Sequence, residues 1–131
     1  MSYQIGDTVP AFVLPRVEGG ELKVDPAASP ATVVVFTSNS CPYAVAWHDR
    51  LQQVARDFAD QGVNVVQINA NRTTDRPHES AEAGAERVAK GDFAGPYLRD
   101  DSQDVARSFG AEKTPDVFVL YGAGRLAYRG A

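Results

Sequence analysis

Val33-Val34-Val35-Phe36-Thr37-Ser38-Asn39-Ser40-Cys41-Pro42 is the stretch that decides the fold. It opens with four apolar residues, three of them β-branched, a pattern typical of a short strand that is covered on both faces. A polar segment follows and ends at Cys41. Pro42 suits the first position of a helix, because its missing N–H would have no partner there. The stretch therefore predicts a buried strand that leads into a helix at a cysteine.

The residues after Pro42 continue this pattern. The helix is predicted from an apolar stripe at steps of four, three and four, which we expect to face the core: Trp47, Leu51, Val54 and Phe58. Gly62 can end the helix, and Val63–Ala70 is a second β-branched strand. A strand, a helix and a strand over this length indicate a right-handed βαβ unit with parallel strands.

The remaining segments predict a mixed sheet. An N-terminal hairpin is expected from Phe12–Leu14 and Glu21–Asp25, and a C-terminal antiparallel hairpin from Val117–Tyr121 and Leu126–Arg129. Between them we expect a polar loop, a surface helix, a short edge strand and a short helix, at Asn71–His78, Glu79–Lys90, Pro96–Leu98 and Asp101–Phe109 respectively. The fold class is α/β, in one domain that spans residues 1–131.

Composition excludes several classes of protein. The chain has 131 residues, a net charge of −4 and one cysteine. An acidic chain argues against general nucleic-acid binding and against an anionic membrane surface. A single cysteine excludes an intramolecular disulfide and a zinc site of several cysteines, and no ligand spacing predicts another metal. The first residues lack the features of a signal peptide, so we expect a cytoplasmic protein that needs no cofactor.

Cys41 is the candidate for chemistry. The N-terminus of a helix offers unpaired N–H groups and a partial positive charge, and both favour a thiolate over a thiol. The alternative is that Cys41 is a small buried hydrophobe. His48 lies two helical turns further on, too far to pair with the sulfur, and is expected at the surface.

The order of these features resembles the thioredoxin superfamily: a strand at Val33–Phe36, Cys41-Pro42-Tyr43-Ala44, a long helix, and Thr114-Pro115 before a hairpin. The resemblance implies a mixed central sheet flanked by helices, with Cys41 as the nucleophile. It also implies that Pro115 is the cis-proline that packs against Cys41 and that Thr114 presents its backbone to a bound thiol or peptide. The sequence given stops before the final helix of this fold, so either the chain is truncated or another surface covers that face of the sheet, and we expect a homodimer.

Further segments resemble the redoxin group (AhpC/TSA, peroxiredoxin-like) within that superfamily. The opening Gly6-Asp7-Thr8-Val9-Pro10-Ala11-Phe12 is similar to theirs, as are Asn39–Tyr43, Gln67–Asn71, Pro96–Leu98, Ala111–Asp116 and Gly124–Gly130. Three positions depart from the patterns. Ala44 replaces the second cysteine of Cys-x-x-Cys, Lys113 stands where relatives often have a cysteine, and Val34 replaces the proline of the peroxiredoxin motif. Ser38 keeps the Ser/Thr position of that motif.

The resemblance and the departures predict one-cysteine redox chemistry. Cys41 would attack a peroxide or a disulfide, and an external thiol, glutathione-like or a thioredoxin, would complete the cycle. Lys113 would lower the thiol pKa or lie free in solvent. Thr37 and Ser38 would donate to the thiolate or cap the helix, and Tyr43 would line the rim or be simply exposed. The alternative function is a non-catalytic module that binds a partner in the groove around Cys41 and Pro115.

Overall fold

The structure is a computed structural model that describes residues 2–73 and 76–130. Its central element is a five-stranded mixed sheet. Its order is β5-β4-β3-β6-β7, with bounds Tyr97–Arg99, Val63–Asn69, Ala31–Thr37, Asp116–Tyr121 and Arg125–Gly130. The first three of these strands are parallel, and β6 and β7 run antiparallel to their neighbours. A separate hairpin is formed by β1 (Phe12–Pro15) and β2 (Glu21–Val24). The predicted mixed sheet and both hairpins are confirmed.

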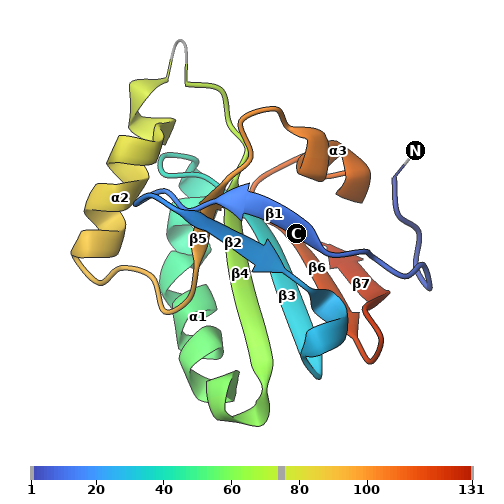
Figure 1. Ribbon diagram of the computed structural model, residues 1–131. Coiled ribbons are helices and arrows are strands. Elements are labelled where there is room, and N and C mark those ends of the chain that lie inside the picture. The colour runs from blue at the N-terminus through green and yellow to red at the C-terminus, as the bar shows by residue number, and fades with distance from the viewer. Residues whose placement is uncertain (1, 74–75, 131) are drawn as a thin grey trace.

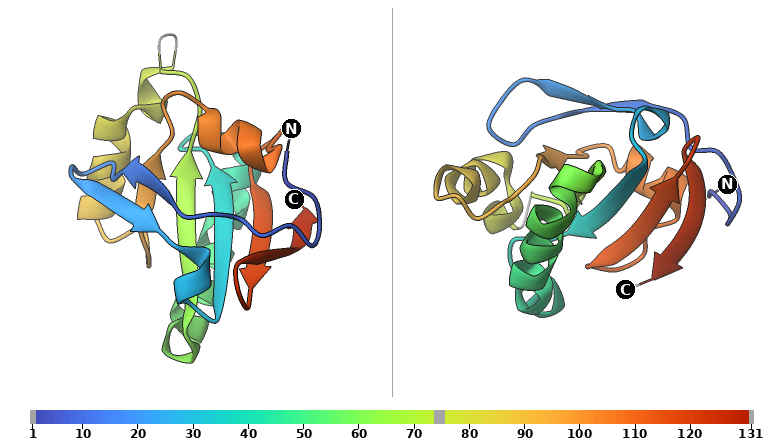
Figure 2. Two further views of the ribbon diagram at one scale, coloured as in Figure 1. Left: turned by 45° about the vertical axis from the view of Figure 1, so that its right-hand side comes forward. Right: turned by 90° about the horizontal axis from the view of Figure 1, so that it is seen from below.

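Two layers cover the sheet. One face carries α1 (Pro42–Phe58), with α2 (Ala81–Ala89) beside it along the β5 edge, and the other face carries the β1–β2 hairpin and α3 (Asp104–Phe109) (Figures 1 and 2). Among the described residues, three 3₁₀ turns complete the elements: η1 (Pro26–Ala28), η2 (Ala59–Gln61) and η3 (Pro77–Glu79). The start of α1 lies at the carboxyl ends of β3 and β4, where α3 also lies (Figure 2).

Strand β3 is central because alternate residues enter two cores. Val34 and Phe36 join the larger core under the hairpin and α3, while Val33 and Val35 face α1. Both Val34 and Val35 are fully buried, as expected for a strand covered on both faces. Because β3 is packed on both faces, it fixes where the following segment, which ends at Cys41, leaves the sheet.

The buried face of α1 differs from the predicted one. It is rotated about the helix axis by about one residue from the apolar stripe. Trp47 is 48% exposed, and Val54 and Phe58 are also exposed. The helix buries a different set of residues: Ala44, Gln52 and Ala55, with Leu51 packed against the core beside them. Small alanine side chains let the helix approach the sheet closely, and the large apolar residues are left at its flank. Trp47 instead lies under the Arg50 guanidinium, 5.1 Å from the ring centroid.

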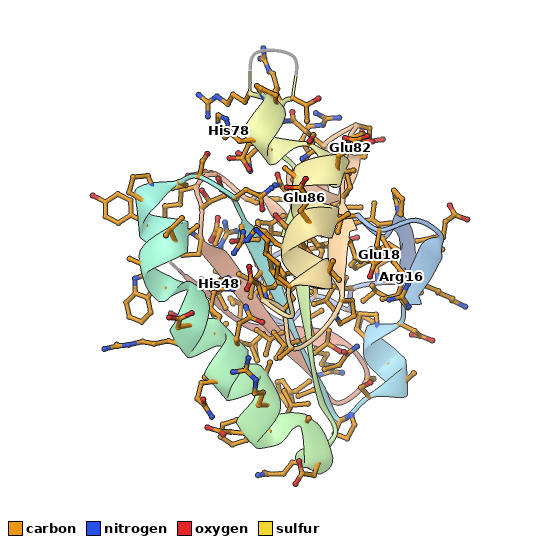
Figure 3. All side chains as sticks on the ribbon, turned by 90° about the vertical axis from the view of Figure 1, so that its left-hand side faces the viewer. Arg16, Glu18, His48, His78, Glu82 and Glu86 are labelled. Atoms are coloured by element: carbon orange, nitrogen blue, oxygen red, sulfur yellow. The ribbon has the colours of Figure 1, made fainter. Side chains whose placement is uncertain are left out.

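The second correction concerns the segment before α2. The helix begins at Ala81, with Ser80 as its N-cap, so Glu79 precedes it. Glu79 was expected on a surface helix but is only 1% exposed. His48, also expected at the surface, is half-buried between α1 and α2 (Figure 3). Both residues belong to a polar network behind Cys41, which explains why they face inward.

The helices of the described residues contain no segment that is both long enough and apolar enough to cross a bilayer.

Candidate active site

Cys41 lies at the N-cap of α1. Its backbone is extended, with φ −61° and ψ 125°, its carbonyl oxygen accepts the first helical bond from Val45 N–H at 2.9 Å, and its side chain is half-buried. Pro42 is the first helical residue, as predicted. The sulfur therefore faces the unpaired N–H groups of the first helical turn.

Thr114 approaches the sulfur from a distant part of the chain. The Cys41 Sγ–H donates to the Thr114 carbonyl oxygen over 3.3 Å, and the Thr114–Pro115 peptide bond is cis. Pro115 itself is buried. The structure thus brings together three residues that the sequence singled out, Cys41, Thr114 and Pro115.

The surroundings lower the pKa of the Cys41 thiol from its ordinary value of 9.0. The largest cause is a side-chain hydrogen bond with Thr114, and the backbone N–H groups of Tyr43 and Ala44 act in the same direction because they stabilise the thiolate. Partial burial and the negative charge of Glu79 oppose the shift, as does the Thr114 carbonyl, which accepts only from the protonated thiol. The net effect is a lowered pKa, which shifts the equilibrium between thiol and thiolate toward the thiolate.

Glu79 organises the loop that precedes Cys41. Its carboxylate accepts hydrogen bonds from the Asn39 backbone N–H at 2.7 Å, from the Ser40 hydroxyl at 2.7 Å and from the Ser38 hydroxyl. A fourth donor is the Asn69 side-chain amide at 3.0 Å. These bonds lower the pKa of the Glu79 carboxyl below its ordinary value of 4.5, although burial alone would raise it. A buried carboxylate held by neutral donors thus fixes the loop.

Ser38 passes this restraint on to Cys41. Its buried hydroxyl donates to Glu79 and accepts from the Cys41 N–H at 2.9 Å and the Ser40 N–H at 3.1 Å. Ser38 therefore holds the backbone that precedes α1 and does not cap the helix, whose N-terminus has no side-chain cap bond. A direct contact of Ser38 with substrate stays a prediction.

Further polar residues hold the loop before Cys41 through hydrogen bonds. The Tyr97 hydroxyl donates to Asn39 Oδ1 at 2.8 Å, and burial raises the pKa of Tyr97 to about 12, so the hydroxyl stays protonated at neutral pH. Arg87 donates to Asn39 Oδ1 at 2.8 Å and to His48 Nδ1 at 3.2 Å. The His48 Nε2–H donates to the Asp92 carbonyl oxygen at 2.7 Å. These contacts tie α1, α2 and β5 to the loop.

Comparison with known families identifies the group to which this site belongs. The model of the AhpC/TSA family matches residues 5–129. The chain belongs to the AhpC/TSA family. A search of the curated proteins finds no match.

Solved structures share the fold of this chain. A hypothetical protein from Sinorhizobium meliloti 1021 is 41% identical, with a TM-score of 0.89, and the match covers 100% of this chain and 72% of that one. An uncharacterized conserved protein from Geobacillus kaustophilus is 31% identical, with a TM-score of 0.91 and coverage of 98% and 69%. Peroxidoxin BcpB from Mycobacterium tuberculosis is 20% identical, with a TM-score of 0.77 and coverage of 97% and 84%. Thioredoxin structures match as well, and the predicted thioredoxin-like fold is confirmed.

Two predicted site residues of this AhpC/TSA protein lie near the sulfur without a fixed contact to it. Tyr43 is 73% exposed in the first turn of α1, two residues after Cys41. Lys113 is exposed beside Thr114, and it is not among the groups that dominate the pKa shift of Cys41. The expected effect of Lys113 on that pKa stays a prediction.

Sequence reasoning missed Glu79, which connects the loop to the rest of the fold. One signal was available. Ser38, Asn39 and Ser40 form a row of hydrogen-bond donors directly before the nucleophile, and such a row needs an acceptor. Within residues 2–73 and 76–130, no three His, Cys, Asp or Glu side chains gather as metal ligands do.

Proposed function

We propose that this protein is a one-cysteine, thiol-dependent oxidoreductase with an antioxidant or thiol-redox role. The family and the thioredoxin-like fold support the general class, a thiol–disulfide oxidoreductase or a peroxiredoxin-like protein. The observation that carries the finer proposal is the half-buried Cys41 sulfur, placed at the start of α1 against Thr114 with a lowered pKa. A thiolate in such a position is the reactive form of cysteine.

With a peroxide, the Cys41 thiolate attacks one peroxide oxygen. An S–O bond forms as the O–O bond breaks, and the leaving oxygen takes a proton to become an alcohol or water. The sulfur loses two electrons and becomes a sulfenic acid. A thiol then displaces water from the sulfenic acid and forms a mixed disulfide with Cys41. A second thiolate attacks that disulfide, which releases the Cys41 thiolate and a disulfide of the two external thiols.

With a disulfide substrate, the Cys41 thiolate attacks one sulfur and expels the other as a thiolate. Cys41 is then joined to one half of the substrate, and an external thiolate attacks that half, which releases the Cys41 thiolate. The chain contains no second cysteine, so each cycle takes its reductant from outside. We propose a glutathione-like thiol or a thioredoxin for this role, in a reducing compartment such as the cytoplasm.

The proposed roles of the neighbouring residues follow from their places. Thr114 holds the thiolate through its side chain and offers its backbone to the incoming thiol or peptide. Pro115 shapes that backbone segment. Tyr43 is free to pack on a ligand at the rim, because most of its ring is exposed. Ser38 sets the direction of the Cys41 backbone, and Lys113 adds a positive charge beside Thr114.

The test measures acidity and reactivity of the same sulfur. The rate of alkylation of Cys41 is followed against pH, and the intact mass is then recorded after one equivalent of hydrogen peroxide. We expect an alkylation midpoint below 9.0 and a mass gain of one oxygen, which converts to a mixed disulfide on addition of thiol. The Cys41→Ser variant serves as the control and should show neither change.

A midpoint at or above the ordinary value, with no oxygen adduct and no mixed disulfide, would contradict the proposal. That result would favour the alternative function, a non-catalytic module that binds a partner around Cys41 and Pro115. Ala44 and Lys113, which stand where relatives often carry cysteines, are the features that support this alternative.

We also propose that two copies of this single domain form a homodimer. The face of β6 and β7 on the α1 side presents Tyr121 and Tyr128, which are 55% and 53% exposed. Trp47, Val54 and Phe58 of α1 are exposed large apolar side chains as well. Burial of such side chains favours association. A monomeric mass by light scattering at micromolar concentration would exclude the dimer.

A further inference from the structure

A groove lined mainly by basic side chains begins at Thr114, the residue that contacts the Cys41 sulfur. Its first hollow, of about 310 Å³, is lined at one end by Lys113 and Thr114. A second hollow, of about 340 Å³, lies next to it. The two share Ala70, Asn71 and Gln103 as lining residues and so form one groove. Each hollow has the volume of a small-molecule site, which is roughly 300–1,000 Å³.

The charge of this groove is opposite to that of the chain. The protein has a net charge of −4, yet four basic side chains and one acidic side chain line the groove: Arg72, Arg76, Arg107, Lys113 and Glu112. Arg107 pairs with Asp104 at 2.5 Å. Among the described residues, no carboxylate lies within 4.0 Å of the side-chain nitrogens of Lys113, Arg72 or Arg76. Within the described residues, these three cations have no ion-pair partner.

Thr114 connects the groove to the sulfur, although Cys41 itself lines neither hollow. Thr114 lines the groove, and its carbonyl oxygen lies 3.3 Å from the Cys41 Sγ. Arg72 and Arg76 lie at the other end, in the second hollow. A molecule with a thiol at the Thr114 end and carboxylates along its length would match the groove in both chemistry and direction. Polar lining groups such as Asn71 and Gln103 can orient its amide bonds.

We propose that this basic groove binds a low-molecular-weight thiol that carries carboxylates, and that this thiol reduces oxidised Cys41. The inference rests on the function proposed above and names the class of reductant. A cleft of one charge raises the local concentration of an opposite charge and the rate of its arrival, by a factor of 10 to 1,000 in strongly charged cases. A small anionic thiol thus reacts faster than its neutral counterpart.

The reaction to be measured starts from a small, neutral mixed disulfide. Methyl methanethiosulfonate converts the Cys41 thiolate into a methyl disulfide and releases methanesulfinate. An added thiolate then attacks this disulfide, the original S–S bond breaks, and a new one forms between the added sulfur and either Cys41 or the methylthio group. Loss of the methyl disulfide is followed by intact mass in acid-quenched samples, so the assay does not depend on a peroxide.

Glutathione and its diethyl ester are the two probes, compared at equal thiolate concentration. The ester has the same backbone but no free carboxylate. We expect glutathione to react roughly tenfold faster at low ionic strength, the lower end of the gain that charged clefts give. This advantage should shrink in 0.5 M salt, where the Debye length falls to about 4 Å.

Charge-reversal variants test whether the faster reaction of glutathione depends on the basic side chains of the groove. Lys113→Glu, and separately Arg72→Glu with Arg76→Glu, should bring the ratio of the two rates close to one. Arg56→Glu is the matched control, because Arg56 is exposed fourteen residues after Pro42, about 21 Å along α1. It should keep the wild-type ratio. All these residues are exposed, and urea unfolding of each variant checks that the fold is intact.

Equal rates for glutathione and its ester in the wild-type protein would overturn the inference, as would an equal loss in Arg56→Glu. These outcomes are distinct from failure of the proposed function. If the alkylation midpoint lies at or above 9.0 and Cys41 forms no oxygen adduct with peroxide and no mixed disulfide with a disulfide substrate, the oxidoreductase proposal fails, whereas the exchange assay still reports on the groove.

Discussion

The Cys41 Sγ and the Thr114 carbonyl oxygen lie 3.3 Å apart, although 73 positions separate the two residues in the chain. This contact joins the first turn of α1 to the segment before β6, and it places Thr114 both at the sulfur and in the basic groove. Thr114 is therefore the residue through which the acidity of the thiol and the approach of a ligand are connected.

Replacing the Thr114 hydroxyl should make Cys41 less acidic. Thr114→Val keeps the shape of the side chain but removes its hydrogen bond, the largest cause of the lowered pKa. The alkylation midpoint should then move up toward 9.0, and the alkylation rate at pH 7 should fall several-fold. Thr114→Ser retains a hydroxyl and should keep most of the rate. An unchanged midpoint in Thr114→Val would assign the shift to the helix N–H groups alone.

Glu79→Gln should destabilise the protein at neutral pH. The amide group of glutamine cannot accept from all the donors that Glu79 satisfies, and a buried donor left without a partner costs about 1–3 kcal/mol. We expect a loss of about 2 kcal/mol in the free energy of unfolding, measured with urea. Glu86→Gln on α2, where the carboxylate is exposed (Figure 3), should change stability by less than about 0.5 kcal/mol.

The stability difference between the wild type and Glu79→Gln should depend on pH, and its sign can be predicted. The pKa of Glu79 is lower in the folded state than its ordinary value of 4.5. The carboxylate therefore stabilises the fold fully above pH 4.5, and this contribution is lost as the pH falls through the folded pKa. The difference in stability between wild type and Glu79→Gln should shrink over that acidic range. A difference that stays constant down to pH 3 would contradict the assigned role of the charge.

Ser38 and Ser40 should differ in how much they contribute to the free energy of unfolding. The buried Ser38 hydroxyl accepts two backbone N–H bonds and donates to Glu79, whereas the exposed Ser40 hydroxyl only donates to Glu79. Ser38→Ala should cost about 1–3 kcal/mol of unfolding free energy, and Ser40→Ala about 1 kcal/mol or less. Equal costs, measured by urea unfolding, would show that the loop is held by the Glu79 charge rather than through Ser38.

The rotation of α1 can be tested with two alanine substitutions. Trp47 is half-exposed, whereas Leu51 packs against the core. We expect Trp47→Ala to cost less than about 1.5 kcal/mol, and Leu51→Ala about 2–3 kcal/mol. Replacing a tryptophan in a protein core by alanine costs about 3–5 kcal/mol. A cost in that range for Trp47→Ala would show that Trp47 is buried, as the sequence predicted.

The sequence predicted the parts of this structure that depend on local pattern. The apolar run Val33–Phe36, the helix that begins at Pro42 and the two hairpins all follow from residue types over short windows. The proximity of Cys41 to Pro115 came instead from the resemblance to the thioredoxin superfamily, because the two residues are far apart in the chain.

The sequence could not place Glu79 or the inward face of α1. Glu79 stands before an Ala/Glu-rich helix, where a glutamate is ordinarily solvated, and only the path of the residues after β4 carries it behind the Cys41 loop. The face of α1 was read from the largest apolar side chains. The sheet selects the small residues Ala44 and Ala55 instead, and Gln52 turns inward because its side-chain oxygen accepts from the Ala94 N–H at 2.8 Å.

The groups that tune the Cys41 thiol come from three stretches of chain, around residues 38–44, at Glu79 and at Thr114. A ribosome-bound chain that ends before Thr114 lacks the largest of the influences that make the sulfur acidic. At a pH below 9.0, a thiol reagent should therefore label folded molecules faster than incomplete or unfolded ones, so the labelling rate of Cys41 reports whether the chain has folded.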